Sequence, residues 1–185
     1  MQYTEVEKKF RIDDPDTLRA RLREMGARSS GTFHQVDQYY NHPHRDFLQP
    51  PIVSEWLRLR DQNGTTSINY KRWLPLGAER QTHCDEFEST LADGEAVRQL
   101  LAALDFTEMV KVIKTREEFV LDDRLTIAVD SVVGLGSFVE FEYRGHTDSV
   151  ERAHEELSQL IDELRVELGE RDRRGYPYQL LGRQR

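Results

Sequence analysis

Two glutamates and a lysine alternate near the start of the chain, in the segment Tyr3–Phe10. The segment is predicted to be a strand, so Glu5, Glu7 and Lys9 share one face. Carboxylates about 7 Å apart on a strand face suit a hard cation such as Mg²⁺ or Mn²⁺, which takes oxygen ligands. The lysine beside them can meet a phosphate oxygen. An exposed strand face with offsetting charges gives the same pattern, so the triplet alone leaves both interpretations open.

Length and composition favour one domain over residues 1–185, with 37% hydrophobic and 32% charged residues. No apolar run approaches the roughly 18 residues that a membrane span needs, and the N-terminus lacks the pattern of a signal peptide. Cys84 is the single cysteine, so we expect no intrachain disulfide and a cytoplasmic location. The net charge of −8 argues against a partner that is a nucleic acid or an anionic membrane.

Three segments have one apolar face at helical spacing: residues 15–25, 93–104 and 149–168. Pro15 suits the first turn of the first helix, and Gly26 and Gly169 suit the ends of the first and third. Between the helices, alternating segments predict strands at about 34–41, 52–61, 65–73, 80–89, 108–121, 124–131 and 137–144. Asn63-Gly64 predicts a hairpin. With the first strand this gives about eight strands, which predicts the α+β class: an antiparallel sheet or barrel with helices outside.

Charged side chains gather on one face of each predicted strand, and the sign differs between strands. The basic groups are Arg58 with Arg60, Lys71, and Lys114 with Arg116; the acidic groups are Glu86 with Glu88, Asp130, and Glu140 with Glu142. If these faces point inward, a carboxylate wall and a basic wall suit a metal–polyphosphate complex. A solvated sheet face predicts the same alternation. Lys8 lies on the opposite face of its strand and is expected to be solvated.

Two other groups of residues are weaker candidates for a functional site. His42 and His44 could suggest zinc, but zinc sites usually need three or four protein ligands, so a polar loop is the better interpretation. Cys84 falls on the charged face without an evident catalytic partner, which favours a bystander thiol.

The ordered motifs resemble the CYTH superfamily, also called triphosphate tunnel metalloenzymes. Glu5-Val6-Glu7-Lys8-Lys9 is similar to its E-x-E-x-K motif. The later motifs follow in the family's order: Gln35-Val36-Asp37-Gln38-Tyr39, Leu57-Arg58-Leu59-Arg60, Tyr70-Lys71, Lys114-Thr115-Arg116, and Asp130 followed by the segment 134–142. At the C-terminus the chain departs from the family's Ser-Tyr-x-x-Leu-Leu tail, which leaves the role of Tyr176 open.

The resemblance implies a single CYTH domain whose eight-stranded antiparallel β-barrel, with flanking helices, is open as a tunnel for a triphosphate. It implies that Mg²⁺ or Mn²⁺ is held by Glu5, Glu7, Glu140 and Glu142. The residues implied to bind the triphosphate are Lys9, Arg58, Arg60, Lys71, Lys114 and Arg116. Lys9 and Asp130 would have catalytic or orienting roles, and Asp37, Tyr39, Glu86 and Glu88 would support these groups.

The family includes class IV adenylate cyclases, thiamine triphosphatases and inorganic triphosphatases, so the resemblance leaves the reaction open. Length and the Gly134–Phe138 turn favour the cyclase, which converts ATP to cyclic AMP and pyrophosphate. The loop Asn41–Phe47 is expected to cover a tunnel mouth and contact a base. The alternatives are a triphosphatase acting on thiamine triphosphate, inorganic triphosphate or a nucleoside triphosphate, and a non-catalytic module that binds polyphosphate. A homodimer is compatible with the sequence, which does not fix the oligomeric state.

Overall fold

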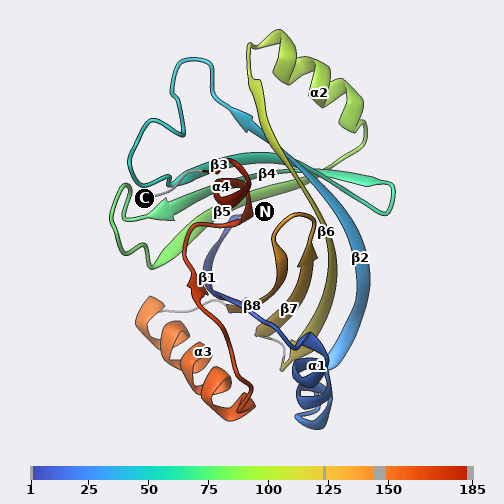
Figure 1. Cartoon of the computed structure of the whole chain (residues 1–185). Helices are drawn as coiled ribbons and strands as arrows, with labels where there is room; N and C mark the ends of the chain where they lie inside the picture. Colours follow the sequence, from blue (N-terminus) through green and yellow to red (C-terminus); the bar gives the residue numbers. More distant parts are fainter. Residues whose placement is uncertain (1, 123, 144–148, 183–185) are drawn as a thin grey trace. The chain divides into compact units, whose positions relative to one another are not determined.

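The computed structural model describes residues 2–122, 124–143 and 149–182 (Figure 1). The strands in this part of the chain are β1 (Gln2–Arg11), β2 (Arg28–Asn41), β3 (Glu55–Gln62), β4 (Thr65–Leu74), β5 (His83–Leu91), β6 (Thr107–Leu121), β7 (Leu125–Val132), β8 (Gly136–Tyr143) and β9 (Arg171–Asp172). The helices are α1 (Pro15–Glu24), α2 (Gly94–Ala103), α3 (Val150–Leu164) and α4 (Tyr176–Leu180).

The strands belong to one sheet in the order β5-β4-β3-β2-β6-β7-β8-β1-β9, and an additional pairing joins β5 to β1. That pairing connects the two ends of the run of eight long strands, so the sheet closes into a barrel. The pairings whose register is described are antiparallel. The predicted class, an eight-stranded antiparallel β-barrel with helices, is therefore confirmed.

The observed elements differ from the predicted ones mainly at their ends. The strand predicted at 34–41 begins earlier, at Arg28, and the strand predicted at 52–61 begins later, at Glu55. Two short elements, β9 and α4, were not predicted. Residue 144, at the end of the last predicted strand, lies outside the described residues.

The third helix ends at Leu164 and not near Gly169, because Arg165 adopts a left-handed conformation with φ of 52°. Gly169 has a different use: its backbone N–H donates to the carbonyl oxygen of Arg11 at 2.9 Å. A Cβ at this position would lie 3.1 Å from that same oxygen, so the close approach to β1 favours glycine. This contact precedes β9, which pairs with β1.

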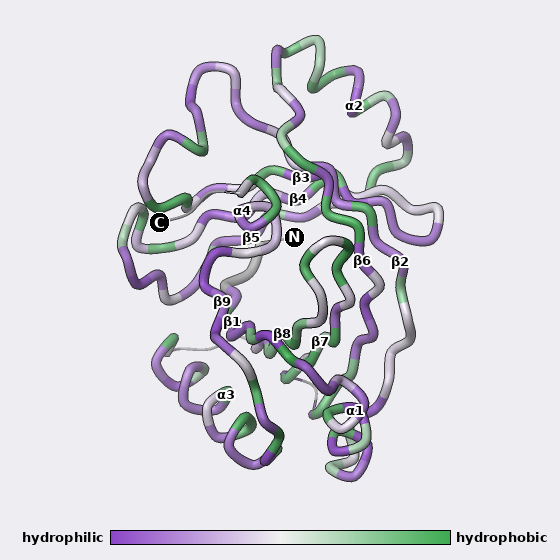
Figure 2. Tube along the Cα trace, viewed as in Figure 1, coloured by the Kyte–Doolittle hydropathy of each residue, from purple (hydrophilic) through white to green (hydrophobic). Residues whose placement is uncertain are grey.

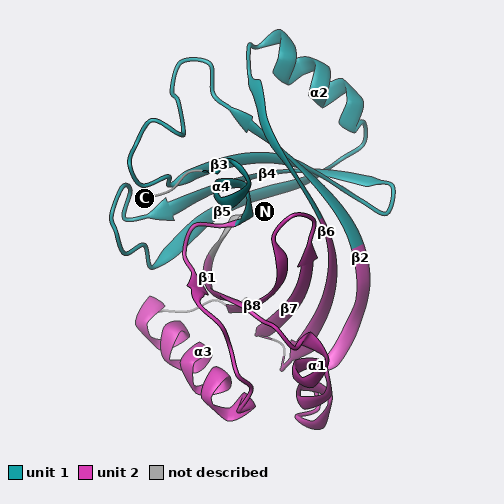
Figure 3. Cartoon of the chain, viewed as in Figure 1, with its two compact units in different colours: residues 1–4, 34–113, 176–185 teal, residues 5–33, 114–175 magenta. Residues whose placement is uncertain are grey.

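The chain divides into two compact units (Figure 3). Unit 1 contains residues 1–4, 34–113 and 176–185, and unit 2 contains residues 5–33 and 114–175. Each unit is assembled from segments that are far apart in the sequence, and each has its own apolar core.

In unit 2, helices α1 and α3 lie against one face of the β1, β6, β7 and β8 strands. Val6, Phe119 and Phe141 from the strands are fully buried with Leu18 of α1 and Leu157 of α3. Apolar and polar residues alternate along α3 in Figure 2, which is the pattern of a helix with one buried face. Ser149 caps the start of α3 by accepting a hydrogen bond from the backbone N–H of Arg152.

In unit 1, helix α2 packs through Leu101 on the apolar face that contains Tyr40, Leu57 and Leu59. Phe47 joins the same cluster and is 3% exposed. Phe47, the last residue of the loop Asn41–Phe47, thus packs in the apolar core of unit 1, and the expected contact of this loop with a base stays a prediction.

Candidate functional site

Three carboxylates meet on the face of unit 2 that the helices do not cover. One oxygen each of Glu5, Glu140 and Glu142 lies within 4.8 Å of the others. The three residues are buried, with Glu5 only 1% exposed. Glu5 comes from β1, and the other two come from the neighbouring strand β8. Buried carboxylates this close together repel one another unless a cation lies among them, and oxygen ligands suit Mg²⁺ or Mn²⁺.

Glu7 does not belong to this trio. Its carboxylate lies 3.7 Å from the ammonium of Lys9, and Lys9 lies 3.1 Å from Glu140. Burial by itself would lower the pKa of Lys9, but Glu140, Glu7 and Asp172 outweigh that effect and raise the pKa well above its ordinary value. Lys9 is therefore a protonated cation at the edge of the carboxylate trio.

A second ionic group continues from Glu140 toward β6 and β7. Arg116 donates to Glu140 at 3.2 Å and makes two hydrogen bonds to Asp130, at 2.8 and 2.7 Å. Lys114 donates to the same Asp130 carboxylate at 3.3 Å. Glu140 thus lies between two cations, Lys9 at one oxygen and Arg116 at the other. The predicted acidic and basic residues of unit 2 form one connected cluster.

Asp172 is a charged neighbour of this cluster that the sequence did not predict. It lies opposite Lys9 in the β1–β9 pairing, so the two side chains share a face. The Asp172 side chain is only 4% exposed, and it accepts a hydrogen bond from the backbone N–H of Arg174 at 3.0 Å. A two-residue strand has too few positions to show an alternating pattern, so periodicity could not indicate it.

Unit 1 carries its own ionic group on the face opposite α2. Arg60 makes two hydrogen bonds to Asp37, at 2.6 and 2.7 Å. Arg58 lies farther from the same carboxylate, at 3.4 Å, and 3.5 Å from the hydroxyl of Tyr39. Burial alone would lower the pKa of Arg58, but Asp37, Tyr39 and Glu86 together outweigh it and raise the pKa.

The other predicted residues of unit 1 lie on β4 and β5. Lys71 is 3.6 Å from Glu86, its partner across the strands, and Asn69 donates a hydrogen bond to the same carboxylate. Glu88 accepts a hydrogen bond from Ser67 at 3.4 Å. Glu86 is 3% exposed. The alternation in these strands therefore reflects a buried polar face, not the solvated one that gives the same sequence pattern.

Lys8 differs from the expectation of a solvated lysine. Its ammonium donates to the backbone oxygen of His154 at 2.9 Å and also contacts the hydroxyl of Ser158. Both partners are on α3, so Lys8 attaches that helix to β1. It lies on the opposite face from Lys9, as predicted, but its role in packing makes it a poor control for a surface lysine.

The two weaker candidates have structural explanations. The Nδ1 atom of His42 accepts hydrogen bonds from the backbone N–H groups of His44 and Arg45, at 3.1 and 3.0 Å. This nitrogen organises a polar loop, as the sequence analysis favoured. Cys84 is a fully buried thiol on β5.

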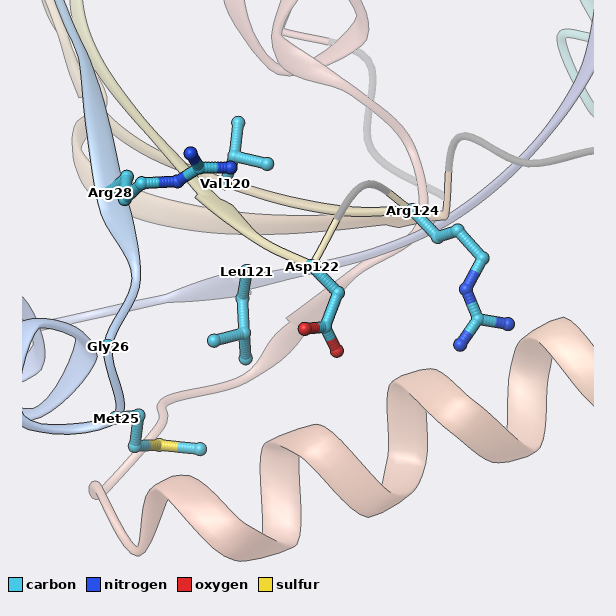
Figure 4. Close-up of a pocket in the computed structure, with 7 residues that line it drawn as sticks. All are labelled: Met25, Gly26, Arg28, Val120, Leu121, Asp122 and Arg124. Atoms are coloured by element: carbon cyan, nitrogen blue, oxygen red, sulfur yellow. The ribbon is translucent and has the colours of Figure 1, made fainter.

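A separate surface hollow of about 610 Å³ lies in unit 2, beside the end of β6 (Figure 4). It is lined by Met25, Gly26, Arg28, Val120, Leu121, Asp122 and Arg124. None of the predicted metal or phosphate residues is among them, so this hollow is distinct from the charged cluster. No helix in the described part of the chain has the length and apolarity needed to cross a membrane.

Comparison with known proteins identifies the family. The CYTH domain model matches residues 3–176, a span that takes in segments of both units. A Methanocaldococcus jannaschii protein, provisionally named an adenylate cyclase, is 30% identical over 163 residues, which cover 88% of this chain and 90% of that protein. The chain belongs to the CYTH domain family.

Solved structures agree with this assignment. A Pyrococcus horikoshii protein is 34% identical, with a TM-score of 0.80 over 96% of this chain and 98% of its own. A Hippeastrum protein is 15% identical, with a TM-score of 0.61 over 91% of this chain and 90% of its own, and shares the fold. That protein is described as an adenylyl cyclase candidate with a dominant triphosphatase activity.

Proposed function

We propose that the chain is a divalent-metal-dependent enzyme that acts on a triphosphate in the cytoplasm, with the reaction of a class IV adenylate cyclase. The product from ATP would be cyclic AMP, with pyrophosphate released. The observation that carries the proposal is the buried trio Glu5, Glu140 and Glu142, directly beside the cations Lys9 and Arg116. Buried acids and bases in contact suit a ligand that contains both a cation and phosphate oxygens.

The residues present fit Mg²⁺ or Mn²⁺. The trio offers carboxylate oxygens that are close together and buried, and hard cations prefer such ligands. Glu7, on the same strand face as Glu5, is proposed as a further ligand. When bound, the cation would withdraw electron density from phosphate oxygens and neutralise their charge.

The bases of unit 2 have a defined part in this proposal. Glu140 now pairs with Lys9 and Arg116. If Glu140 binds the metal cation, Lys9 and Arg116 can each bind a phosphate oxygen in place of the Glu140 carboxylate. Asp130 holds Arg116 in place throughout, through two hydrogen bonds. Lys114 would add a third positive group, and Arg58, Arg60 and Lys71 of unit 1 are proposed to bind phosphate oxygens as well.

Two reactions are compatible with these residues. A relative provisionally named an adenylate cyclase, 30% identical over most of the chain, supports the cyclase. The Hippeastrum protein, described by its triphosphatase activity, supports the alternative, a hydrolase of thiamine triphosphate, inorganic triphosphate or a nucleoside triphosphate. A cyclase must direct the ribose 3′-hydroxyl at the α-phosphorus, whereas a triphosphatase directs water at the γ-phosphorus.

Product analysis tests the proposal. Purified protein is incubated with Mg²⁺ or Mn²⁺ and separately with ATP, thiamine triphosphate and inorganic triphosphate. Cyclic AMP with pyrophosphate is the expected outcome with ATP. Orthophosphate as the main product would replace the cyclase by the triphosphatase. Binding without turnover of any of the three compounds would leave only a polyphosphate-binding module.

A further inference from the structure

The two arginines of β3 stand in different relations to Asp37. Arg60 lies directly opposite Asp37 in the β2–β3 pairing, and Arg58 lies opposite Tyr39, two positions along the same face. Arg60 commits its Nε and one terminal nitrogen to the two carboxylate oxygens, at 2.6 and 2.7 Å. This bidentate arrangement fixes the plane of a guanidinium group.

Arg58 is held less closely and retains an unused donor. Its contacts to Asp37 and Tyr39 are 3.4 and 3.5 Å long, and both involve the same terminal nitrogen. Its Nε is buried and has no hydrogen-bond partner within the described residues. A buried donor without an acceptor is costly. A phosphate oxygen is an acceptor of the charge and geometry that a guanidinium group binds best.

Asp37 is the group that makes this arrangement stable. Two guanidinium groups at alternate positions of one strand face are about 7 Å apart and repel each other, and Asp37, which is 1% exposed, lies between their charges. The side chains of both arginines are 13% exposed. The group has a net charge of +1, from two arginines and one aspartate, so it can still attract an anion.

A similar arrangement of one aspartate and two cations occurs in unit 2, where the aspartate is on β7 and both cations are on β6. Asp130 lies directly opposite Arg116 and binds it through two hydrogen bonds, while the second cation, Lys114, is 3.3 Å away. In each unit, one buried aspartate makes two hydrogen bonds to one arginine and a longer contact to a second cation. The occurrence of this aspartate–cation group in both units supports a role in positioning cations for an anionic ligand.

We propose that Asp37 is a positioning residue for triphosphate binding: it fixes Arg60 and thereby sets the place of Arg58, whose Nε then donates to a phosphate oxygen. Asp37 itself does not touch the ligand. This inference rests on the proposed function, because it takes the ligand to be a triphosphate. It adds to the proposed phosphate contacts of Arg58 and Arg60 a reason why the two guanidinium groups are held in place.

The test is the affinity of the full chain for inorganic triphosphate in the presence of Mg²⁺, measured by calorimetry. Asp37→Asn keeps the size of the side chain but removes its charge and one acceptor. The affinity is expected to fall about 10- to 100-fold, the range seen when a group that orients a metal ligand is removed. The metal concentration for half-maximal binding should stay near that of the wild type. Because loss of a buried charge also lowers the melting temperature, the affinities are compared at a temperature at which both proteins are folded.

A matched control removes an aspartate–arginine pair from the other face of the same unit. Asp85 lies directly opposite Arg72, at 2.7 Å, and Arg72 is 41% exposed. Asp85→Asn should leave the affinity for triphosphate unchanged. Equal losses in Asp37→Asn and Asp85→Asn would overturn the inference, since any broken ion pair would then have the same effect.

A second variant covers the case in which Asp37→Asn does not fold. Arg60→Lys keeps the charge but loses the bidentate fork, so it should also weaken binding, and its effect should be less than additive with that of Asp37→Asn. Wild-type affinity in Arg60→Lys, or in a folded Asp37→Asn, would overturn the positioning role alone. A wild-type chain that binds no triphosphate would remove the proposed function, and this inference with it.

Discussion

Arg116 and Asp130 form a buried pair across β6 and β7, with hydrogen bonds of 2.8 and 2.7 Å and side-chain exposures of 7% and 0%. Burial would raise the pKa of Asp130, but Arg116 and Lys114 together lower it to about 2. The carboxylate therefore stays charged throughout the neutral and mildly acidic range, and it can hold Arg116 at any pH at which the protein would act.

The lowered pKa predicts how stability depends on pH. In the unfolded chain this carboxyl titrates near its ordinary value of 3.8, so the folded state binds fewer protons between pH 4 and 2. The contribution of Asp130 to the free energy of unfolding is therefore complete above about pH 4 and is lost as the pH falls toward 2. The part that is lost is on the order of 2 kcal/mol, from 1.36 kcal/mol per pKa unit.

Urea unfolding of Asp130→Asn and the wild type at pH 6, 4 and 3 measures this effect. The difference in unfolding free energy between the two proteins should shrink as the pH falls. Asp16→Asn is the control, because Asp16 forms an ion pair with Arg19 but its side chain is 89% exposed; it should change little at any pH. A constant difference between Asp130→Asn and the wild type would contradict the lowered pKa.

The carboxylate trio predicts a metal-dependent loss of activity. Glu5→Gln and Glu140→Gln keep nearly the same volume but remove a charged ligand, so both should lose most activity and need more metal for half-maximal rate. Glu7→Gln should also lose activity, with a smaller shift in metal requirement, because Glu7 lies beside Lys9 and outside the trio. A metal titration of turnover measures this, with the exposed Glu24→Gln as control. Wild-type turnover of Glu5→Gln at limiting metal would refute the ligand assignment.

The basic residues predict a face-specific pattern of rate losses. Lys71→Ala, Lys114→Ala and Arg116→Ala should each lower the rate about 100-fold or more, as expected when a charged group at a developing phosphate charge is removed. Lys111→Ala is the control, because Lys111 lies on β6 three positions before Lys114 and is exposed. Steady-state kinetics compare the four variants. Similar losses at positions 111 and 114 would mean that the face assignment is wrong.

Asp172 lies opposite Lys9 in the β1–β9 pairing, so we expect the segment that contains β9 to contribute to the site. Asp172→Asn removes one of the three carboxylates that keep the pKa of Lys9 raised, so the ammonium should be held less firmly and the rate should fall about tenfold. Glu170→Gln is the matched control on an exposed neighbour. Turnover at saturating metal and substrate is measured for both. An Asp172→Asn variant that matches Glu170→Gln would show that β9 only packs against β1.

Much of the fold could be predicted because strand alternation depends only on local sequence. This alternation placed Glu5 and Lys9 on one face of their strand and Glu140 on the charged face of its own strand. The register between β1 and β8 did not, because these strands are more than 120 residues apart. Spacing alone placed Glu5 with Glu7, and only the fold brings Glu140 and Glu142 within 4.8 Å of Glu5.

Other features depend on tertiary contacts that no local pattern records. The end of α3 is set by the left-handed Arg165, although the apolar spacing continues to Leu168, which still packs on the unit 2 core from outside the helix. Likewise, Asp37 and Arg60 become partners only through the β2–β3 register. Composition and motifs indicated that these residues were charged and on one face, but not which pairs would form.

Two nucleotide analogues separate the cyclase from the triphosphatase within one protein. The β,γ-methylene analogue of ATP keeps the oxygen bridge between the α- and β-phosphorus atoms, so a cyclase should convert it to cyclic AMP and release methylenediphosphonate. A triphosphatase must cleave the β–γ linkage and should be blocked. The 3′-deoxy analogue has the reverse effect, because it lacks the cyclase nucleophile but keeps a γ-phosphate that water can attack.

We expect turnover of the methylene analogue and none of the 3′-deoxy compound, with products resolved by chromatography at a fixed concentration of Mg²⁺ or Mn²⁺. Glu5→Gln serves as the control in both reactions, since loss of a trio carboxylate should abolish either chemistry. The opposite pattern, orthophosphate from the 3′-deoxy compound and no product from the methylene analogue, would exclude the cyclase. It would leave the roles of Glu5, Lys9 and Arg116 standing, because both reactions need a cation and positive groups beside the phosphates.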